Sequence, residues 1–194
     1  MRPHPRRTLA VMVVLAAAGC TPMPGTQPSP ATPPAAPASA ALARVHDPGH
    51  VTGHLTGPCR TRDHGRLPDP RCTPGAIDPA VTQATIAATI CRAGYTATVR
   101  PPSSETSAFK RDAAAPAYGL SPGTHGELDH LVPLELGGAN DAANLWIEAG
   151  AIPNPKDSTE AALHRAVCAG RITLGAAQAA IAEDWETADG LVAP

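Results

Sequence analysis

Two short apolar runs separated by a glycine-containing turn give the clearest pattern of hydrophobic and polar positions in the chain. The first run covers residues 128–134 and the second covers residues 144–148, with Gly137-Gly138 between them. Apolar runs of this length, bounded by glycine and asparagine, are typical of strands that pair with each other. We therefore predict a two-stranded antiparallel hairpin in the second half of the chain.

Two helices are predicted after this hairpin. Residues 155–169 begin with proline, which is favoured at the first position of a helix, and Gly170 follows them as an end signal. Thr173 is then a suitable N-cap for a last helix that continues to about Trp185. The predicted order of elements is therefore strand, turn, strand and helix, with one further helix at the end.

The half of the chain before the hairpin carries weaker signals. A helix is predicted over residues 78–92, because Asp78 can cap it and three apolar residues fall near one of its faces. Further predictions are strands over 51–55 and 95–100, a loop over 59–75 and a helix over 104–114. Together these elements indicate an α+β fold that is mainly helical, with the hairpin at its centre.

The start of the chain has the composition of a targeting segment. Three arginines precede an apolar stretch over residues 9–18, which is too short to span a membrane as a mature helix. The stretch ends in Ala17-Ala18-Gly19-Cys20, which resembles the lipobox of bacterial lipoproteins, where the cysteine is lipidated and becomes the new N-terminus. The alternative is an ordinary secretory signal that happens to contain a cysteine.

These features divide the chain into three parts. Residues 1–19 are predicted to be a lipoprotein signal peptide, and residues 20–40 a tether rich in proline and alanine. Residues 41–194 have a length suited to one folded domain. We therefore expect an exported protein that is anchored to the cell membrane through a lipid on Cys20 and lies outside the cytoplasm.

Four cysteines follow the tether. An even number of cysteines in an exported chain predicts two disulfides, for which three pairings are possible. We favour a local bridge, Cys59–Cys72, and a long-range bridge, Cys91–Cys168, which would stabilise a core made of small side chains. The alternative is a structural zinc site, but the chain contains no CxxC pair of the kind that usually holds zinc.

The charge balance does not indicate a strongly basic surface. The chain has 15 Lys and Arg residues against 17 Asp and Glu residues, and removing the three arginines of the signal peptide leaves a net charge of about −5. The nearest approach to a basic cluster lies between Arg60 and Arg71. Because affinity for nucleic acid without sequence preference depends on such clusters, any binding of nucleic acid should be local and sensitive to salt.

The hairpin carries a group of residues with a specific chemistry. Asp129 and His130 are adjacent on the first predicted strand, and Asn140 and Asn144 follow in and after the turn. This pattern resembles the active site of HNH nucleases, and the run Asp-His-Leu-Val-Pro-Leu-Glu-Leu-Gly-Gly is similar to that of exported HNH-like bacterial proteins. The resemblance implies a ββα-metal unit over about residues 127–170 and metal-dependent hydrolysis of phosphodiester bonds.

The resemblance assigns a role to each residue of the motif. His130 would be the general base that activates water, and its ordinary pKa near 6.5 suits this role. Asp129 would bind the metal ion, and Asn144 would orient the histidine and hold the loop. Asn140 is the competing choice for the orienting role, although turn chemistry alone explains an asparagine at that position.

The third position of the motif departs from the commonest pattern. No histidine lies between Trp146 and Glu160, so the position falls to Asn154, which makes the motif an HNN variant. Asp157 is the alternative ligand at this end of the site. Oxygen ligands of this kind favour one divalent metal ion, Mg²⁺ or Mn²⁺, as the cofactor.

Residues around the motif are expected to support it. Lys156 stands at the start of the predicted helix, where a substrate phosphate is also favoured. The alternative for Lys156 is a solvated lysine paired with Asp157 or Glu160. Glu127, Asp157 and Glu160 would support the metal ligands from neighbouring positions.

The expected function is hydrolysis of nucleic acid by an exported, membrane-anchored enzyme, with DNA preferred over RNA as the substrate. The alternative is a non-catalytic lipoprotein of the cell envelope that uses the ββα fold as a binding or structural module. The sequence gives no sign of a protein partner. Metal binding at Asp129 together with cleavage of plasmid DNA would distinguish the enzyme from the module.

Overall fold

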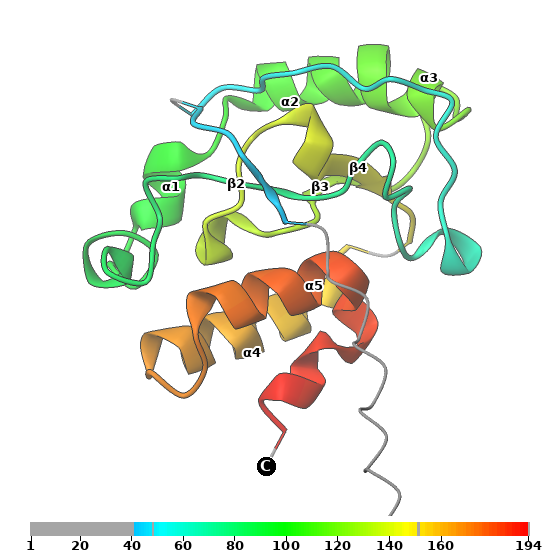
Figure 1. Cartoon of the computed structure of the whole chain (residues 1–194). Helices are drawn as coiled ribbons and strands as arrows, with labels where there is room; N and C mark the ends of the chain where they lie inside the picture. The colour runs from blue at the N-terminus through cyan, green and yellow to red at the C-terminus, as the bar shows by residue number, and fades with distance from the viewer. Residues whose placement is uncertain (1–40, 48, 151, 194) are drawn as a thin grey trace, which may run out of the picture. The chain divides into compact units, whose positions relative to one another are not determined.

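The computed structural model describes residues 41–47, 49–150 and 152–193. The predicted signal peptide, the lipidation site Cys20 and the tether lie outside these residues. Figure 1 shows a short hairpin between a helical segment that precedes it and two helices that follow it. The part of the chain that the structure describes contains no helix long and apolar enough to cross a membrane.

The predicted hairpin is present, with strands shorter than the apolar runs. Strand β3 is Glu127–His130 and strand β4 is Leu145–Glu148, and the two pair antiparallel. Every residue of β4 is buried. The connection between the strands contains two 3-10 turns, Leu134–Leu136 and Ala142–Asn144. The strands are therefore joined by a long, mostly buried connection and not by a tight turn.

The connection between the strands approaches its own backbone closely at Gly138. A Cβ atom at this position would lie 1.7 Å from the carbonyl oxygen of Val132, so only glycine fits. The preceding Gly137 has a φ of 74° and ends the first 3-10 turn in the left-handed conformation. The glycine pair predicted to be a turn is thus required by close packing as well as by backbone conformation.

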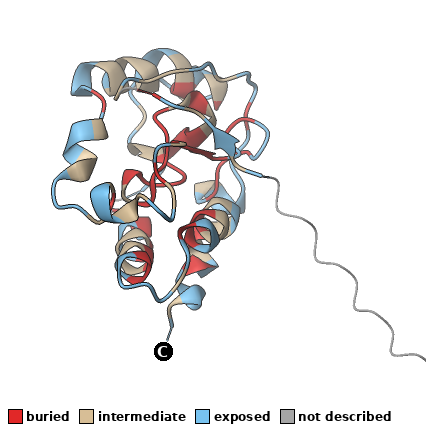
Figure 2. Ribbon diagram, turned by 60° about the vertical axis from the view of Figure 1, so that its left-hand side comes forward, coloured by how far each residue is buried: buried red, intermediate tan, exposed pale blue. Residues whose placement is uncertain are grey.

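The two predicted helices after the hairpin are present. Helix α4 is Lys156–Cys168 and helix α5 is Leu174–Ala188, and they lie side by side (Figure 1). Thr173 caps α5, because its side chain accepts a hydrogen bond from the backbone N–H of Ala176 at 3.2 Å. Buried residues gather on the hairpin and on the inward faces of the helices (Figure 2). The main core includes Val132, Leu136, Leu163, Val167, Leu174, Ile181 and Trp185.

The segment 78–92 forms turns and a short 3-10 helix, Ile86–Ala88, so the predicted α-helix was wrong. Threonine side chains in this segment bond to nearby backbone groups. The Thr85 hydroxyl donates to the carbonyl oxygen of Ala80, and the Thr89 hydroxyl donates to that of Thr85, both at 2.8 Å. Such local bonds compete with the regular backbone bonds of a helix. The apolar spacing in this segment reflects packing of turns against the core.

The two strands predicted in the first half were also wrong. Residues 95–100 contain helix α1, Tyr95–Val99, and residues 51–55 make only an isolated bridge between Thr52 and Asp141. A strand requires a neighbour with free backbone groups, and a single segment of sequence does not show whether one is near. Short apolar runs therefore leave helix and strand undecided.

The strands that do pair in the first half are only two residues each. Strand β1, Ala43–Arg44, runs parallel to strand β2, Ala76–Ile77. Strand β2 lies between the loop predicted up to residue 75 and the helix predicted from residue 78. Its Ile77 also makes a bridge with Gly138, so β2 fastens the start of the domain to the connection of the hairpin.

The helix predicted over 104–114 is present and longer than expected. Helix α2, Ser103–Phe109, continues through a π-helical turn over Lys110–Ala114 into helix α3, Ala115–Ala117. The alanines at the junction of the π-helical turn and α3 pack against Ile147 of β4. This segment therefore covers the hairpin on the side away from α4 and α5 (Figure 1).

Both predicted disulfides are confirmed. Cys59–Cys72 packs in an apolar cluster with Tyr118, Leu131 and Trp146. Cys91–Cys168 joins the last residue of α4 to the segment before α1, across a sequence separation of 77. The α+β class with disulfide support is confirmed at this level of detail.

The long-range disulfide should contribute more stability than the local one. In the chain-entropy description, a loop of 77 residues corresponds to about 4.5 kcal/mol and a loop of 13 residues to about 3 kcal/mol. The double variant Cys91→Ser/Cys168→Ser should therefore lose more free energy of unfolding than Cys59→Ser/Cys72→Ser. Urea denaturation of both variants measures the difference, and equal losses would contradict the expectation.

Candidate functional site

Strand β3 directs its side chains to two different environments. Glu127 and Asp129 alternate with Leu128 and His130, so the two pairs point to opposite faces of the hairpin. Asp129 bonds to Lys156 of α4, whereas His130 bonds to a residue of the connection between the strands. The side chains of the adjacent acid and histidine are therefore held by different partners, although Lys156 also bonds the backbone carbonyl of His130.

A chain of three buried residues fixes the imidazole of His130. Its Nε2 lies 2.8 Å from Oδ1 of Asn140. Asp47 holds the Asn140 amide in turn, accepting from Nδ2 at 2.5 Å and from the backbone N–H at 2.7 Å. Asn140 Nδ2 also donates to the carbonyl oxygen of Val99 at 2.8 Å. The Asp47–Asn140–His130 chain thus links the start of the domain to the motif.

This chain determines which nitrogen of His130 carries the proton. Both N–H groups of the Asn140 side chain are donated to Asp47 and Val99, so only the amide oxygen faces the histidine. Nε2 must therefore be the donor, which leaves the lone pair of the neutral ring on Nδ1. Burial lowers the pKa of His130 from its ordinary value of 6.5, although the Asn140 bond and the Asp129 charge raise it. At pH 7 the ring is neutral and can accept a proton at Nδ1.

Asn144 bonds to the backbone and not to His130, which corrects its predicted role in orienting the histidine. Its Oδ1 accepts from the N–H groups of Val132 at 2.9 Å and Ala76 at 3.3 Å. Its Nδ2 donates to the carbonyl oxygens of Val132 and Ala139, both at 2.9 Å. Asn144 therefore holds the loop, as predicted, while the contact with the histidine comes from Asn140.

Lys156 is completely buried, which corrects its predicted role as a phosphate ligand. Its ammonium donates to Asp129 Oδ2 and to the His130 carbonyl oxygen, both at 2.7 Å, and to Glu160 Oε1. An ammonium has three N–H groups, so none remains for a substrate. Burial alone would lower the pKa of Lys156, but the charges of Asp129 and Glu160 raise it and keep the lysine charged. The pairing with Glu160 is present, within the protein and not in solvent.

Three carboxyl groups lie around the single positive charge of Lys156. Glu148 of β4 is buried near Asp129, and its Oε2 has no hydrogen-bond partner among the described residues. Burial, followed by the charge of Asp129, raises the pKa of Glu148 to about 8. Burial also raises the pKa of Glu160 to about 7, against the effect of Lys156. Glu148 and Glu160 therefore hold protons near neutral pH, and with Asp129 they form an acidic cluster (Asp129, Glu148 and Glu160 around Lys156).

Asn154 precedes α4 and uses both ends of its amide. Its Oδ1 accepts from the backbone N–H of Asp157 at 3.2 Å and so caps the helix, while its Nδ2 lies 3.4 Å from Glu127 Oε2. Burial raises the pKa of Glu127, followed by the charges of Asp129 and Asp157. The structure thus brings Glu127, Asp129 and Asn154 to one side of the hairpin, and Asp157 bonds to this group through its backbone N–H.

A pocket of about 420 Å³ opens beside His130. Its walls come from β3 and from the segment between α1 and the π-helical turn. The polar and charged residues of its lining are Arg100, Ser103, Thr106, Ser107, Lys110, Glu127 and His130. A histidine able to accept a proton therefore lies at the wall of a space that also contains cations and hydroxyl groups.

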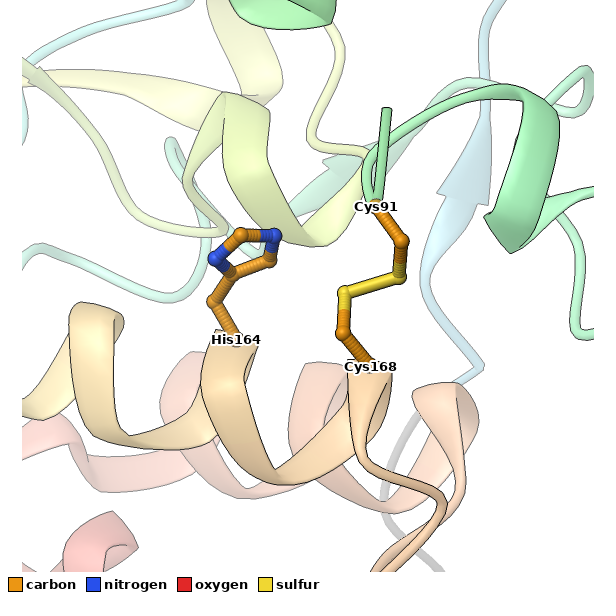
Figure 3. Close-up of side chains that lie close together, drawn as sticks. All are labelled: Cys91, His164 and Cys168. Atoms are coloured by element: carbon orange, nitrogen blue, oxygen red, sulfur yellow. A yellow bond between two sulfur atoms is a disulfide. The ribbon is translucent and has the colours of Figure 1, made fainter. Parts of the chain in front are cut away.

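Cys91, His164 and Cys168 are the one group of three His, Cys, Asp or Glu side chains, among the described residues, whose ligand atoms all lie within 4.8 Å of one another. Figure 3 shows the two sulfur atoms bonded to each other, with the imidazole beside them. His164 Nε2 lies 2.9 Å from the carbonyl oxygen of Ile90. In this form the group is a disulfide beside a packed histidine, because bonded sulfur atoms are not thiolate ligands.

Sequence reasoning missed three residues that the structure adds to the site. Asp47 lies far from the motif in the sequence, and no local pattern connects it to His130. Arg100 belongs to a segment that was predicted to be a strand. A signal did exist for Glu148, because a carboxylate closes an otherwise apolar strand on the face that Glu127 and Asp129 share.

Comparison with known proteins assigns no function to this chain. No family model, curated protein or solved structure matches the chain. Function depends on the geometry and chemistry of particular residues more than on the class of fold. The candidate site has three parts: the Asp47–Asn140–His130 chain, the acidic cluster and the pocket.

Replacing Lys156 by methionine should destabilise the fold strongly. Removing one partner of a buried ion pair costs about 3–5 kcal/mol, because the remaining charges stay buried without compensation. Lys110→Met is the matched control, since Lys110 is only partly buried and its ammonium has one bond among the described residues, to the carbonyl oxygen of Gly126 at 2.5 Å. Denaturant unfolding compares the two variants. A loss for Lys156→Met no larger than that for Lys110→Met would show that the cluster is not structural.

Glu148 should make the fold less stable as the pH rises. Its pKa is raised from 4.5 to about 8 in the folded state, so the folded carboxyl keeps a proton that the unfolded one has lost. The folded state is therefore progressively destabilised between pH 4.5 and about 8. Glu148→Gln, which cannot ionise, should raise the melting temperature near pH 8 in the presence of chelator and change it little near pH 4.5. An equal shift at both pH values would reject the assignment.

Proposed function

We propose that this protein is a metal-dependent phosphodiesterase of the HNH type that cleaves nucleic acid outside the cytoplasm. The observation that carries the proposal is the Asp47–Asn140–His130 chain, which holds a neutral histidine at the wall of a pocket. A general base needs to be unprotonated at the working pH, fixed in orientation and next to space for a substrate. His130 meets these three conditions.

The chemistry of the proposed reaction begins at Nδ1 of His130. This nitrogen accepts a proton from a water molecule, while Nε2–H remains bonded to Asn140 Oδ1. The positive charge that forms on the ring is stabilised by this amide oxygen. Asp47 keeps the oxygen pointed at the ring, because it accepts from both the side-chain and the backbone N–H groups of Asn140.

The residues of the predicted metal site fit a hard divalent ion by their chemistry. Glu127, Asp129 and Asn154 offer oxygen donors on one side of the hairpin, and Lys156 bonds Oδ2 of Asp129 but not Oδ1. The unpartnered Oε2 of Glu148 and the raised pKa of this group indicate a local deficit of positive charge. A bound Mg²⁺ or Mn²⁺ would neutralise charge on the phosphate and on the departing oxygen.

The order of elements supports a ββα-metal unit with an HNN variant of the motif. Strands β3 and β4 are followed by α4, and Asn154 lies at the third position of the motif, at the start of that helix. The two disulfides support export, because such bonds persist in oxidising compartments. Membrane anchoring through Cys20 remains part of the proposal on the basis of the sequence alone.

One observation favours the alternative of a non-catalytic envelope module. The ammonium of Lys156 already compensates part of the charge of Asp129, so the fold carries a cation of its own at this place. A protein that has replaced a metal ion by a lysine could keep the hairpin and helix without cleaving a substrate. The cleavage assay below decides between these two functions.

Replacing His130 should lower turnover without removing metal binding. His130→Ala should cleave a labelled oligonucleotide about 10²–10⁴-fold more slowly in Mg²⁺ or Mn²⁺, because general-base assistance is lost. Binding of Mn²⁺, followed by electron paramagnetic resonance, should change little. The wild-type rate should fall as the pH drops below 6.5, since the pKa of His130 is lowered, and chelator should abolish it.

Three matched variants complete this test. Asn140→Ala should give a milder form of the His130→Ala defect, whereas Asn144→Ala should act mainly by lowering stability. His164→Ala should keep the wild-type rate, because this histidine lies beside the Cys91–Cys168 disulfide and not in the pocket. If His130→Ala cleaves as fast as wild type, the nuclease proposal fails and the binding module is preferred.

A further inference from the structure

Arg100 is an unpaired cation at the wall of the pocket. It is exposed, it follows α1 directly, and its guanidinium has no hydrogen bond or ion pair among the described residues. It lines the same pocket as His130. Arg100 is therefore both close to the candidate base and free to bind an anion.

Other groups of the pocket suit the same kind of ligand. Lys110 donates to the carbonyl oxygen of Gly126, which leaves two of its three N–H groups for another acceptor. Serine hydroxyl groups from α2 line the same space. Glu127 is the acid in the lining, and its Oε2 lies 3.4 Å from Asn154 Nδ2. Together the guanidinium, the ammonium and the hydroxyl groups match the acceptors of a phosphate group.

Three exposed arginines elsewhere among the described residues form ion pairs with acids. Arg66, Arg71 and Arg111 each form an ion pair with a nearby carboxylate. The net charge after removal of the signal peptide is about −5, so a long duplex would meet repulsion outside the pocket. Within the pocket, Arg100 and Lys110 can compensate about two phosphate groups.

We propose that the pocket binds two adjacent phosphodiester linkages of a single-stranded nucleic acid, one through Arg100 and one through Lys110. The proposal rests on the proposed function for the reaction, and it names the substrate form and the phosphate ligands. Arg100 takes the role that Lys156, being buried, cannot fill. One of these linkages would then lie in the same pocket as His130, where an activated water molecule could reach its phosphorus atom.

Binding of a short fluorescein-labelled DNA strand to the full-length chain tests the proposal. Fluorescence anisotropy is measured in chelator, which prevents metal-dependent cleavage, over a series of salt concentrations. Each phosphate contact contributes about −0.7 to the slope of log K against log salt for single strands, so two contacts predict a slope of about −1.4. The same strand with uncharged methylphosphonate linkages should not bind.

Arg100→Gln should weaken the binding about tenfold, as expected for loss of a charged hydrogen-bonding partner, and should bring the slope to about −0.7. Arg171→Gln is the matched control, because it removes the same charge from the exposed turn between α4 and α5. It should change neither the affinity nor the slope. The melting temperature of each variant shows that the fold is retained.

Three results of the binding assay would contradict the proposed phosphate pocket: equal weakening in both arginine variants, no binding of the charged strand, or tighter and more salt-dependent binding of a duplex of the same sequence. Cleavage is scored separately. Arg100-dependent binding by a chain that never cleaves would leave the pocket in place and reject the proposed nuclease. Cleavage with an unchanged KM in Arg100→Gln would reject the pocket alone.

Discussion

The ammonium group of Lys156 joins the hairpin to the helix that follows it. Lys156 is the first residue of α4, and its bonds reach two consecutive residues of β3 and, one turn further along its own helix, Glu160. Helix α4 cannot slide along the hairpin without leaving buried charges unpaired, which is costly inside a protein. The place of Asn154 beside Glu127, and hence the geometry of this side of the hairpin, follows from that constraint.

Asn144 and Asn140 stabilise different parts of the other face of the hairpin. Asn144 uses its whole amide on backbone groups, so it determines the shape of the connection between the strands. Asn140 uses its amide on Asp47, Val99 and His130, so it determines the direction and the tautomer of the imidazole. The shape of the loop and the orientation of the histidine are therefore controlled by different residues. A change in one need not disturb the other.

The sequence was sufficient where local chemistry decides the structure. Proline at the start of α4, the Thr173 cap of α5 and the even number of cysteines all led to correct predictions. It was insufficient where a distant partner decides the structure. Residues 95–100 were predicted to be a strand but contain helix α1, Tyr95–Val99, because the sequence does not show whether a partner strand lies nearby. The same limit applies to the site. Residue types at positions 129 and 130 were informative, but nothing local showed that Lys156 would be buried against them.

Because Asp47 supports His130 through Asn140, the effect of a proteolytic cut depends on which side of Asp47 it falls. Asp47 is one of the first described residues, a few positions after the predicted tether, yet it holds the amide that orients the imidazole. Under the proposed anchoring through Cys20, a protease that cleaves within the predicted tether would release an intact domain. Cleavage just beyond Asp47 would remove the support of the histidine while leaving the hairpin, α4, α5 and both disulfides in place. Only a short stretch of chain thus separates a cut that releases the domain from a cut that removes the support of His130.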